Sequence, residues 1–200
     1  MDPLADLTQQ FSHMPGLGRR SAERLALWLA RRGAGAIDPL LAALSSVRDE
    51  TAICSRCGAI TTRDLDPCRM CSDPARDHTM ILVVEDAGDV LSIERSGAYR
   101  GLYHVLGGRV SAMDGVGPAD LAVESLRRRL ADGPVAEVVL ALPTDVEGDA
   151  TASFLAEWLV RANPGLRVTR LAFGLPADSA VRYSDPLTLR RAIAGRVPGA

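Results

Sequence analysis

All four cysteines of this 200-residue chain lie in one short segment, spaced as Cys54-x2-Cys57-x10-Cys68-x2-Cys71. Each Cys-x2-Cys pair offers two close thiolates, and two such pairs can surround one Zn²⁺ ion as a tetrahedron. The surrounding segment 51–78 has few aliphatic residues, so it cannot build a hydrophobic core and needs a cross-link of this kind. The spacing predicts a four-cysteine zinc finger with one structural Zn²⁺ per chain. An iron–sulfur cluster or a redox pair are the alternatives.

A finger of this type can serve in two ways. It can contact nucleic acid or a partner protein, or it can act as a structural clip that holds two domains together. Four thiolate ligands leave no open coordination position for a reacting group, so the metal is not expected to be catalytic. We therefore favour the clip.

The composition is that of a globular protein, with 47% hydrophobic and 24% charged residues, and a chain of this length can bury a sizeable core. The formal net charge of −2 gives no overall attraction to nucleic acid or to a membrane, so any anion-binding surface must be local. No apolar run reaches the length of a membrane span, and the start of the chain, with Asp2 and Asp6, lacks the features of a signal peptide. We expect a cytoplasmic protein that does not contact membranes.

The first part of the chain is expected to be helical. Apolar residues repeat at helical spacing over 4–11, before a glycine turn, and a second helix is predicted over 20–32. Gly33 and Gly35 should end that helix, and a short third helix is predicted over 39–47.

Downstream of the cysteines, short apolar runs alternate with amphipathic segments. Strands are predicted at 80–84, 103–106, 138–142 and 168–173, and helices at 88–94, 118–131, 150–162 and 186–194. Strands that alternate with helices indicate a parallel sheet covered on both faces. The fold class is therefore a multi-part chain with α+β and α/β character. Its parts are an N-terminal helical hairpin, a four-cysteine zinc finger, a parallel α/β sheet and a short C-terminal helical segment.

The turn Pro15-Gly16-Leu17-Gly18, followed at once by Arg19 and Arg20, has the form of a helix–hairpin–helix. Glycines let the backbone approach a phosphate closely, and the amides that open the next helix are ready donors for it. On a helical wheel Arg20, Arg24 and Arg31 fall within about 40° of one another. The residues expected to pack on the opposite side are Ala22, Leu25, Ala26, Leu29 and Ala30.

This basic helix has two interpretations. It can belong to an ordinary helical hairpin whose arginines are solvated, or it can contact the DNA backbone with little sequence preference. A zinc module beside it favours DNA contact, with Arg19, Arg20 and Arg24 as the candidate residues. One such stripe reaches only a few phosphates, so useful affinity requires several copies of the chain acting together.

Acidic residues follow two of the predicted strands. They are Glu85 and Asp86 after the strand at 80–84, and Asp145, Glu147 and Asp149 after the strand at 138–142. Open α/β sheets place their sites at the C-terminal ends of strands, and converging carboxylates there can hold Mg²⁺ for phosphoryl-transfer chemistry. The alternative is that the carboxylates cap helices, with Asp86 and Asp149 at helix starts. The sequence does not decide whether Mg²⁺ binds.

The same residues resemble a known domain. Val83-Val84-Glu85, followed by the turn Asp145-Val146-Glu147-Gly148-Asp149 and a helix, is similar to the Toprim domain of topoisomerases and primases. A Toprim domain placed after a helix–hairpin–helix and a four-cysteine finger resembles the RecR family of bacterial recombination mediators. Further matching segments are Met14–Gly18 with Arg20–Arg24, Asp114–Pro118, Gly174-Leu175-Pro176, and the ending from Thr188 to Arg196.

The chain divides into four zones, 1–50, 51–78, 79–175 and 176–200. By resemblance these are a helix–hairpin–helix DNA-binding domain, a zinc finger, a Toprim domain and a C-terminal segment. The implied function is DNA repair and recombination without catalysis, by an oligomeric DNA clamp, a tetrameric ring or a dimer, at the nucleoid. The clamp would act with RecO and RecF to load RecA on gapped DNA coated by single-strand binding protein.

The resemblance also assigns residues by position. Arg20 and Arg24 match the hairpin positions that face DNA. The matching zinc ligands are Cys54, Cys57, Cys68 and Cys71, and the matching acidic surface, associated with partner contact, is Glu85, Asp145, Glu147 and Asp149.

Two departures from the family pattern bear on function. Catalytic Toprim enzymes carry an acid where this chain has Pro143, which weakens the enzyme interpretation. In the C-terminal segment, Ala177-Asp178-Ser179 stands where a glycine pair is usual. A Mg²⁺-dependent Toprim nuclease acting on DNA is the alternative function, and a zinc-stapled scaffold that never meets DNA is a third.

Overall fold

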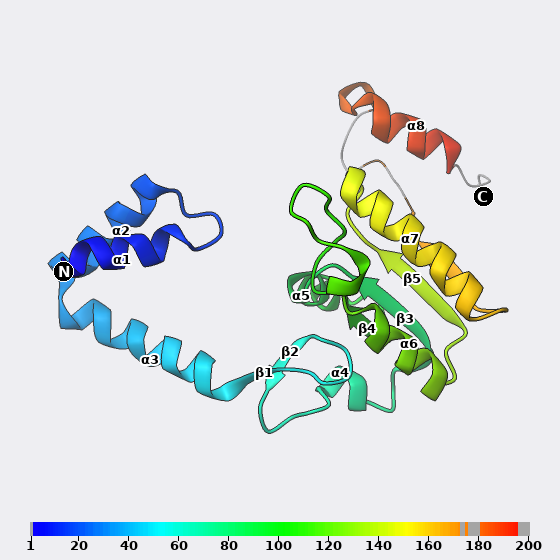
Figure 1. Ribbon diagram of the computed structural model, residues 1–200, viewed down its shortest axis with the longest axis horizontal. Helices are drawn as coiled ribbons and strands as arrows, with labels where there is room; N and C mark the ends of the chain where they lie inside the picture. Colours follow the sequence, from blue (N-terminus) through cyan, green and yellow to red (C-terminus); the bar gives the residue numbers. More distant parts are fainter. Residues whose placement is uncertain (1, 173–174, 176–180, 196–200) are drawn as a thin grey trace. The chain divides into compact units, whose positions relative to one another are not determined.

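The computed structural model of the 200-residue chain describes residues 2–172, 175 and 181–195. The chain forms two compact units, Met1–Thr51 and Ala52–Ala200, which we call the hairpin unit and the sheet unit. Figure 1 shows the helices and strands of each unit. None of the helices in the described part of the chain is long and apolar enough to cross a lipid bilayer.

The hairpin unit contains the helices α1 (Pro3–Ser12), α2 (Arg19–Arg32) and α3 (Ala34–Glu50). Asp2 caps α1, because its carboxylate accepts a hydrogen bond of 3.0 Å from the Leu4 amide. α1 and α2 pack against each other, and the buried residues of α2 are Ala22, Ala26 and Leu29. The prediction of a helical N-terminal part is confirmed.

Two details of the hairpin unit correct the prediction. α3 begins at Ala34 and contains Gly35 and Pro39, because Gly33 alone, at φ +61°, reverses the chain between α2 and α3. The predicted packing of Leu25 and Ala30 is wrong, since both are exposed. The reason is that only one narrow row of α2, formed mainly by alanines, is buried, and residues beside that row face solvent.

The sheet unit is built on parallel strands, which in the described residues are ordered β4-β3-β5-β6. The strands are β3 (Asp77–Val84), β4 (Gly101–Val105), β5 (Glu137–Ala141) and β6 (Arg167–Arg170). The apolar run Ile81–Val84 of β3 lies between two strands and is buried throughout, as expected for a central parallel strand. Val84 pairs with Val105 of β4 and Ala141 of β5. The C-terminal ends of these strands therefore lie together at one edge of the sheet.

Helices cover the sheet, as predicted. They are α5 (Ala87–Ser96), α6 (Val123–Asp132) and α7 (Val146–Ala162), and α8 (Pro186–Ala194) follows near the end of the chain. On one face of the sheet, Leu126 of α6 and Leu155 of α7 pack in a core with Ile81 and Val83. Side chains along β3 alternate between the two faces of the sheet. On the other face, Val90 of α5 packs with Leu82 and Val84 of β3.

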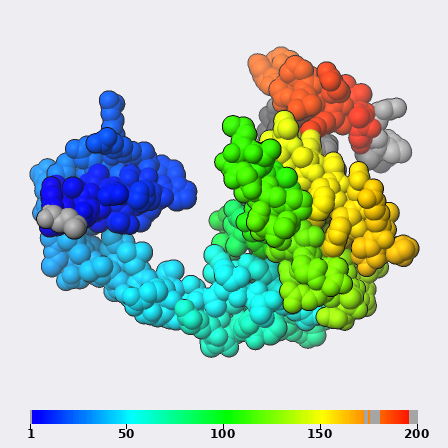
Figure 2. Space-filling model, viewed as in Figure 1, coloured from blue at the N-terminus to red at the C-terminus, as the bar shows by residue number. Residues whose placement is uncertain are grey.

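That second face is also covered by residues 52–76, which we call the cysteine segment. β1 (Thr51–Ile53) leads into it, and β2 (Ile60–Thr62) and α4 (Arg69–Ser72) belong to it. Its four cysteines share a core with Leu82, Val84 and Tyr103, and the Val105 amide donates a hydrogen bond of 2.8 Å to the Cys57 carbonyl. Figure 2 shows the segment lying directly against the rest of the sheet unit. A segment too poor in aliphatic residues to form its own core thus shares the core of the sheet.

Two helix boundaries differ from the prediction for tertiary reasons. The helix expected over 118–131 is split into a 3₁₀ helix, Pro118–Asp120, and α6. The split follows because Leu121 is buried with an extended backbone and the Ala122 amide donates to the Leu106 carbonyl at 2.9 Å. α7 begins at Val146 instead of 150, since Asp145 supplies its N-cap.

The end of the sheet is shorter than expected. β6 ends at Arg170, whereas the prediction placed a strand over 168–173. Phe173 lies outside the described residues, as do Gly174, Pro176, the segment Ala177-Asp178-Ser179 and Arg196.

Candidate functional site

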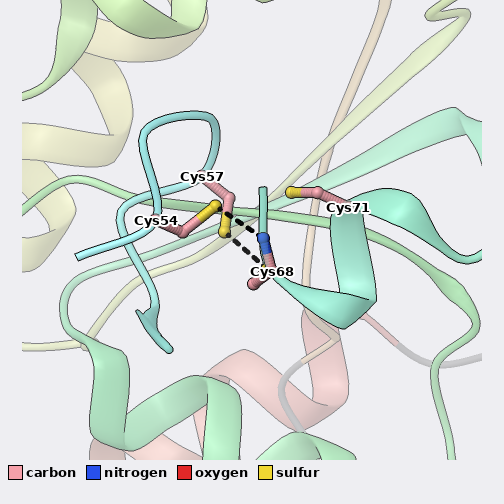
Figure 3. Close-up of side chains that lie close together, drawn as sticks. All are labelled: Cys54, Cys57, Cys68 and Cys71. Atoms are coloured by element: carbon pink, nitrogen blue, oxygen red, sulfur yellow. Dashed lines mark hydrogen bonds between the residues drawn. The ribbon is translucent and has the colours of Figure 1, made fainter. Parts of the chain in front are cut away.

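The four cysteine side chains converge in the sheet unit (Figure 3). Their Sγ atoms all lie within 4.8 Å of one another, and all four residues are buried. The Sγ atoms of Cys57 and Cys68 are 3.6 Å apart. A tetrahedral site with zinc–sulfur bonds of about 2.3 Å has edges of about 3.8 Å. The cluster can therefore hold a metal ion such as zinc, as the spacing of the cysteines indicates.

Tight turns position both cysteine pairs. In the first pair Gly58 adopts φ +78°, and its amide donates a hydrogen bond of 3.0 Å to the Cys54 carbonyl. A Cβ at position 58 would lie 3.2 Å from Val105, so the glycine also lets the turn approach β4 closely. In the second pair Cys68 precedes α4, and the Cys71 amide donates to its carbonyl at 2.9 Å.

Burial changes the acidity of the thiols. A hydrogen bond with Cys71, together with burial, raises the pKa of Cys57, and burial raises the pKa of Cys68 to about 11. Cys57 and Cys68 therefore keep their protons at neutral pH unless a cation among the thiols favours the thiolates, whereas hydrogen bonds from the backbone of the cluster outweigh burial and lower the pKa of Cys54. A divalent metal that binds them releases those protons.

A buried arginine fits an anionic cluster. Arg129 of α6 is only 8% exposed. Its Nη1 donates to the Tyr103 carbonyl, whereas its Nη2 has no hydrogen-bond partner within the described residues. Burial lowers the pKa of Arg129, and negative charge on the nearby cysteines opposes that change. A buried cation without a counter-charge is costly, and a divalent metal held by four thiolates supplies that counter-charge. The cysteines and Arg129 together fit a bound metal.

The basic residues of the hairpin unit lie at the start of α2. Gly16 adopts φ +80° in the turn before the helix, and Gly18 opens α2 without a side-chain cap. In the part of the chain that the structure describes, the amides of the first turn of α2 therefore have no side-chain acceptor. Arg19, Arg20 and Arg24 are exposed, and within the described residues they make no ion pair.

Three of the four predicted acidic residues meet at the C-terminal edge of the sheet. Glu85 follows β3, and Asp145 and Glu147 lie at the start of α7. All three lie against the guanidinium of Arg109. Its Nη1 is 2.6 Å from Asp145 Oδ2, and its Nε is 3.0 Å from Glu147 Oε2. Glu85 Oε1 is 3.9 Å from the same Nε. We call Glu85, Asp145 and Glu147 the acidic edge.

Asp149 does not belong to the acidic edge. Its carboxylate pairs with Arg191 of α8 at 2.5 Å and with Arg170 at 3.7 Å. The capping alternative is confirmed for Asp86, the N-cap of α5. Asp149 lies in the first turn of α7, at the start of a helix as that alternative expects, but it is not the N-cap. The N-cap of α7 is Asp145, whose Oδ1 accepts a backbone hydrogen bond of 2.8 Å.

Sequence reasoning missed Arg109 as a site residue. Arg109 lies in the loop after β4 and directly follows Gly107 and Gly108, which both have positive φ. The sequence did offer one signal for Arg109: it follows a strand of the parallel sheet, and the C-terminal ends of these strands are where the acidic residues also gather. Arg129 and Arg191 offered no such signal, since their partners are distant in the sequence.

The charges of the acidic edge act on one another. Burial raises the pKa of Glu85, against the attraction of Arg109. The pKa of Asp145 is lowered by the hydrogen bond from the Gly148 amide and, in addition, by Arg109. The acidic edge is thus arranged around a cation that the chain itself provides.

Comparison with known proteins finds a matching family in each of the two units. The family described as RecR, helix-hairpin-helix, matches residues 4–48, and the family described as Toprim domain matches residues 79–172. The recombination protein RecR of Moorella thermoacetica is 48% identical over 98% of this chain and 96% of its own length. The RecR protein of Anaeromyxobacter dehalogenans is 45% identical over 98% of this chain and 96% of its own. With a matching hairpin, a matching Toprim sheet and relatives that align along almost its whole length, this chain belongs to the RecR family of recombination proteins.

Proposed function

We propose that this protein is a recombination mediator in DNA repair that holds DNA without cutting or joining it. It would clamp DNA at the nucleoid, in the cytoplasm, as a tetrameric ring or a dimer. With RecO and RecF it would load RecA on gapped DNA coated by single-strand binding protein. Family membership supports the mediator role, and the exposed arginines at the uncapped start of α2 carry the DNA-binding part.

DNA contact is proposed for Arg19, Arg20 and Arg24. Because these residues make no ion pair within the described residues, their charge is available to phosphates. Within the described residues no atom lies within 4 Å of where a Cβ would stand at Gly16 or Gly18, so the backbone of these two glycines is open to a phosphate group. Such contacts read the DNA backbone and give little sequence preference.

The oligomer is supported by an apolar stripe on α3. Leu41, Leu44 and Val47 are spaced three residues apart along the helix, and each is more than half exposed. None of the residues of α3 is buried within the chain. A second copy of the chain would cover this stripe, and it would bring a second set of DNA-facing arginines to the clamp.

The metal is proposed to be one structural Zn²⁺ held by Cys54, Cys57, Cys68 and Cys71. It supplies a cross-link rather than chemistry, because four thiolates complete its coordination. The shared core with Leu82 and Tyr103 supports this role, since the cross-link then fixes the cysteine segment on the sheet.

Partner contact is proposed at the acidic edge and at Asp149. Two strongly exposed apolar residues lie near the acidic edge in the sequence. Met113, 94% exposed, is in the loop that carries Arg109, and Val146, 86% exposed, is next to Asp145. Apolar side chains next to partly exposed carboxylates are typical of a protein-binding surface. RecO or RecF is the proposed occupant.

The mediator role is tested with RecA on gapped circular DNA coated by single-strand binding protein. The expected result is that this protein and RecO together shorten the lag before RecA hydrolyses ATP. The variant Met113→Asp with Val146→Asp should lengthen the lag again while DNA binding stays unchanged. A lag that does not depend on this protein contradicts the mediator role.

A further inference from the structure

The Toprim fold implies a divalent cation among the carboxylates at the sheet edge, and the residues of this chain do not fit one. Arg109 lies against all three carboxylates of the acidic edge. We propose that the Arg109 guanidinium takes the place of that cation, so that the acidic edge excludes Mg²⁺ and forms no nuclease centre. The proposal rests on the contacts of the Toprim domain and not on RecA loading.

The guanidinium engages the edge from two of its nitrogens. Nη1 contacts Asp145 at 2.6 Å, and Nε contacts Glu147 at 3.0 Å. A guanidinium is a planar fork with several N–H donors, so a single arginine can serve two carboxylates at once. Mg²⁺ requires oxygen ligands at about 2.1 Å in near-octahedral geometry. The same carboxylate oxygens cannot meet that requirement while they contact the guanidinium.

Arg109 is held by the two elements that carry the acids. The Gly107 amide donates to the Glu85 carbonyl at 3.0 Å, which ties the loop to the end of β3. The Val110 amide donates to Thr151 Oγ1 at 3.0 Å, which ties it to α7. Thr151 is fully buried, and its hydroxyl donates in turn to the Glu147 carbonyl at 2.7 Å. The position of the guanidinium is therefore set by the same residues that place the carboxylates.

The remaining ligand positions are also taken. Asp145 Oδ1 caps α7 by accepting from the Gly148 amide, so this carboxylate has one oxygen left for a cation. Pro143 stands where catalytic Toprim enzymes carry a further acid. The first turn of α7 packs directly on Pro143, because a Cβ at Gly148 would lie 2.2 Å from its carbonyl oxygen. Asp149 is occupied by Arg170 and Arg191.

Without the Arg109 guanidinium, the acidic edge should bind a divalent cation instead of excluding it. Glu85, Asp145 and Glu147 would then face one another without a counter-ion, and their mutual repulsion favours the capture of a divalent cation. Removal of a cationic side chain is thereby expected to create a metal site that the natural chain excludes.

The test titrates the full-length, zinc-loaded protein with Mn²⁺ and follows free and bound ion by EPR. Mn²⁺ suits this purpose because it prefers oxygen ligands and does not compete for the cysteines. We expect no Mn²⁺ at the acidic edge of the wild-type protein. Arg109→Ala should bind one Mn²⁺ per chain at least about tenfold more tightly than wild type, and adding Glu85→Gln should abolish that binding.

Arg109→Lys is the matched control, because it keeps a positive charge in the loop and should still exclude Mn²⁺ although an ammonium group lacks the planar fork. Zinc content and melting temperature show whether each variant is folded. If Arg109→Ala does not fold, Arg109→Gln keeps much of the side-chain volume without the charge and is titrated instead.

Two results would overturn the proposal. One is Mn²⁺ bound by the wild-type protein and lost in Glu85→Gln, a comparison that needs no change at position 109. The other is a folded, zinc-containing variant without the Arg109 charge that gains no Mn²⁺ site. Both are measured without DNA or RecA, so they are distinguishable from a failure of the mediator role.

Discussion

Removal of the metal from the cysteine cluster is expected to unfold the cysteine segment and to destabilise the sheet unit with it. The four cysteines share a core with Leu82, Val84 and Tyr103, so loss of the cross-link uncovers one face of the sheet. Structural zinc in small domains contributes about 10–16 kcal/mol of apparent binding free energy. That is comparable to the total stability of a domain, about 5–15 kcal/mol. The melting temperature of the sheet unit should therefore fall by more than about 10 °C.

Thermal unfolding and limited proteolysis measure this effect, after chelation and in the variant Cys57→Ala with Cys71→Ala. The control is Ser72→Ala, which removes an exposed hydrogen bond to the Pro67 carbonyl beside a ligand and leaves all four thiols in place. Its cost should stay within about 1.5 kcal/mol. DNA retention should fall with zinc loss, because the cysteine segment lies along the chain between the hairpin unit and the rest of the sheet unit. Unchanged melting and protease resistance after chelation would show that the clip role is wrong.

Charge reversal at Arg20 and Arg24 is expected to remove most DNA binding and to leave the fold intact. Both side chains are exposed and unpaired within the described residues, so the substitutions disturb no packing. Each lost phosphate contact reduces the slope of log affinity against log salt by about 0.9. Arg20→Glu with Arg24→Glu should thus lower that slope by about 2 per subunit. An oligomer multiplies the loss, because several subunits grip the same DNA.

The measurement is DNA binding over a series of salt concentrations, with circular dichroism as the check on folding. Arg95→Glu with Arg161→Glu is the matched control, since it makes the same change in net charge on exposed residues of α5 and α7. An equal loss in both double variants would assign the effect to overall charge. Unchanged binding after reversal at Arg20 and Arg24 would favour a scaffold that never meets DNA.

The sequence predicts the features that depend on local chemistry. The Cys-x2-Cys pairs close into one cluster because each pair needs only a short turn, such as the one at Gly58. The buried half of the central strand, Ile81–Val84, is found from its apolar run, whereas the polar start of β3 from Asp77 is not. The helix over 186–194 begins where predicted, because Asp185 caps it and Pro186 opens it.

The remaining features depend on partners that are distant in the sequence. The break before α6 follows from the hydrogen bond between Ala122 and Leu106, which no local pattern reveals. The grouping of acids could be expected from strand ends, but the exclusion of Asp149 depends on Arg191, far along the chain. Arg109 likewise meets Asp145 only because the sheet brings two loops together.

Holding DNA without cutting it is tested most directly on circular DNA. The zinc-loaded protein is incubated with supercoiled and with gapped circles in Mg²⁺, and the same samples are run on native and on denaturing gels. We predict DNA that is retarded on the native gel and covalently intact on the denaturing gel. Nicked, relaxed or linear DNA that disappears with Glu85→Ala would contradict the non-catalytic clamp and establish the Mg²⁺-dependent nuclease in its place.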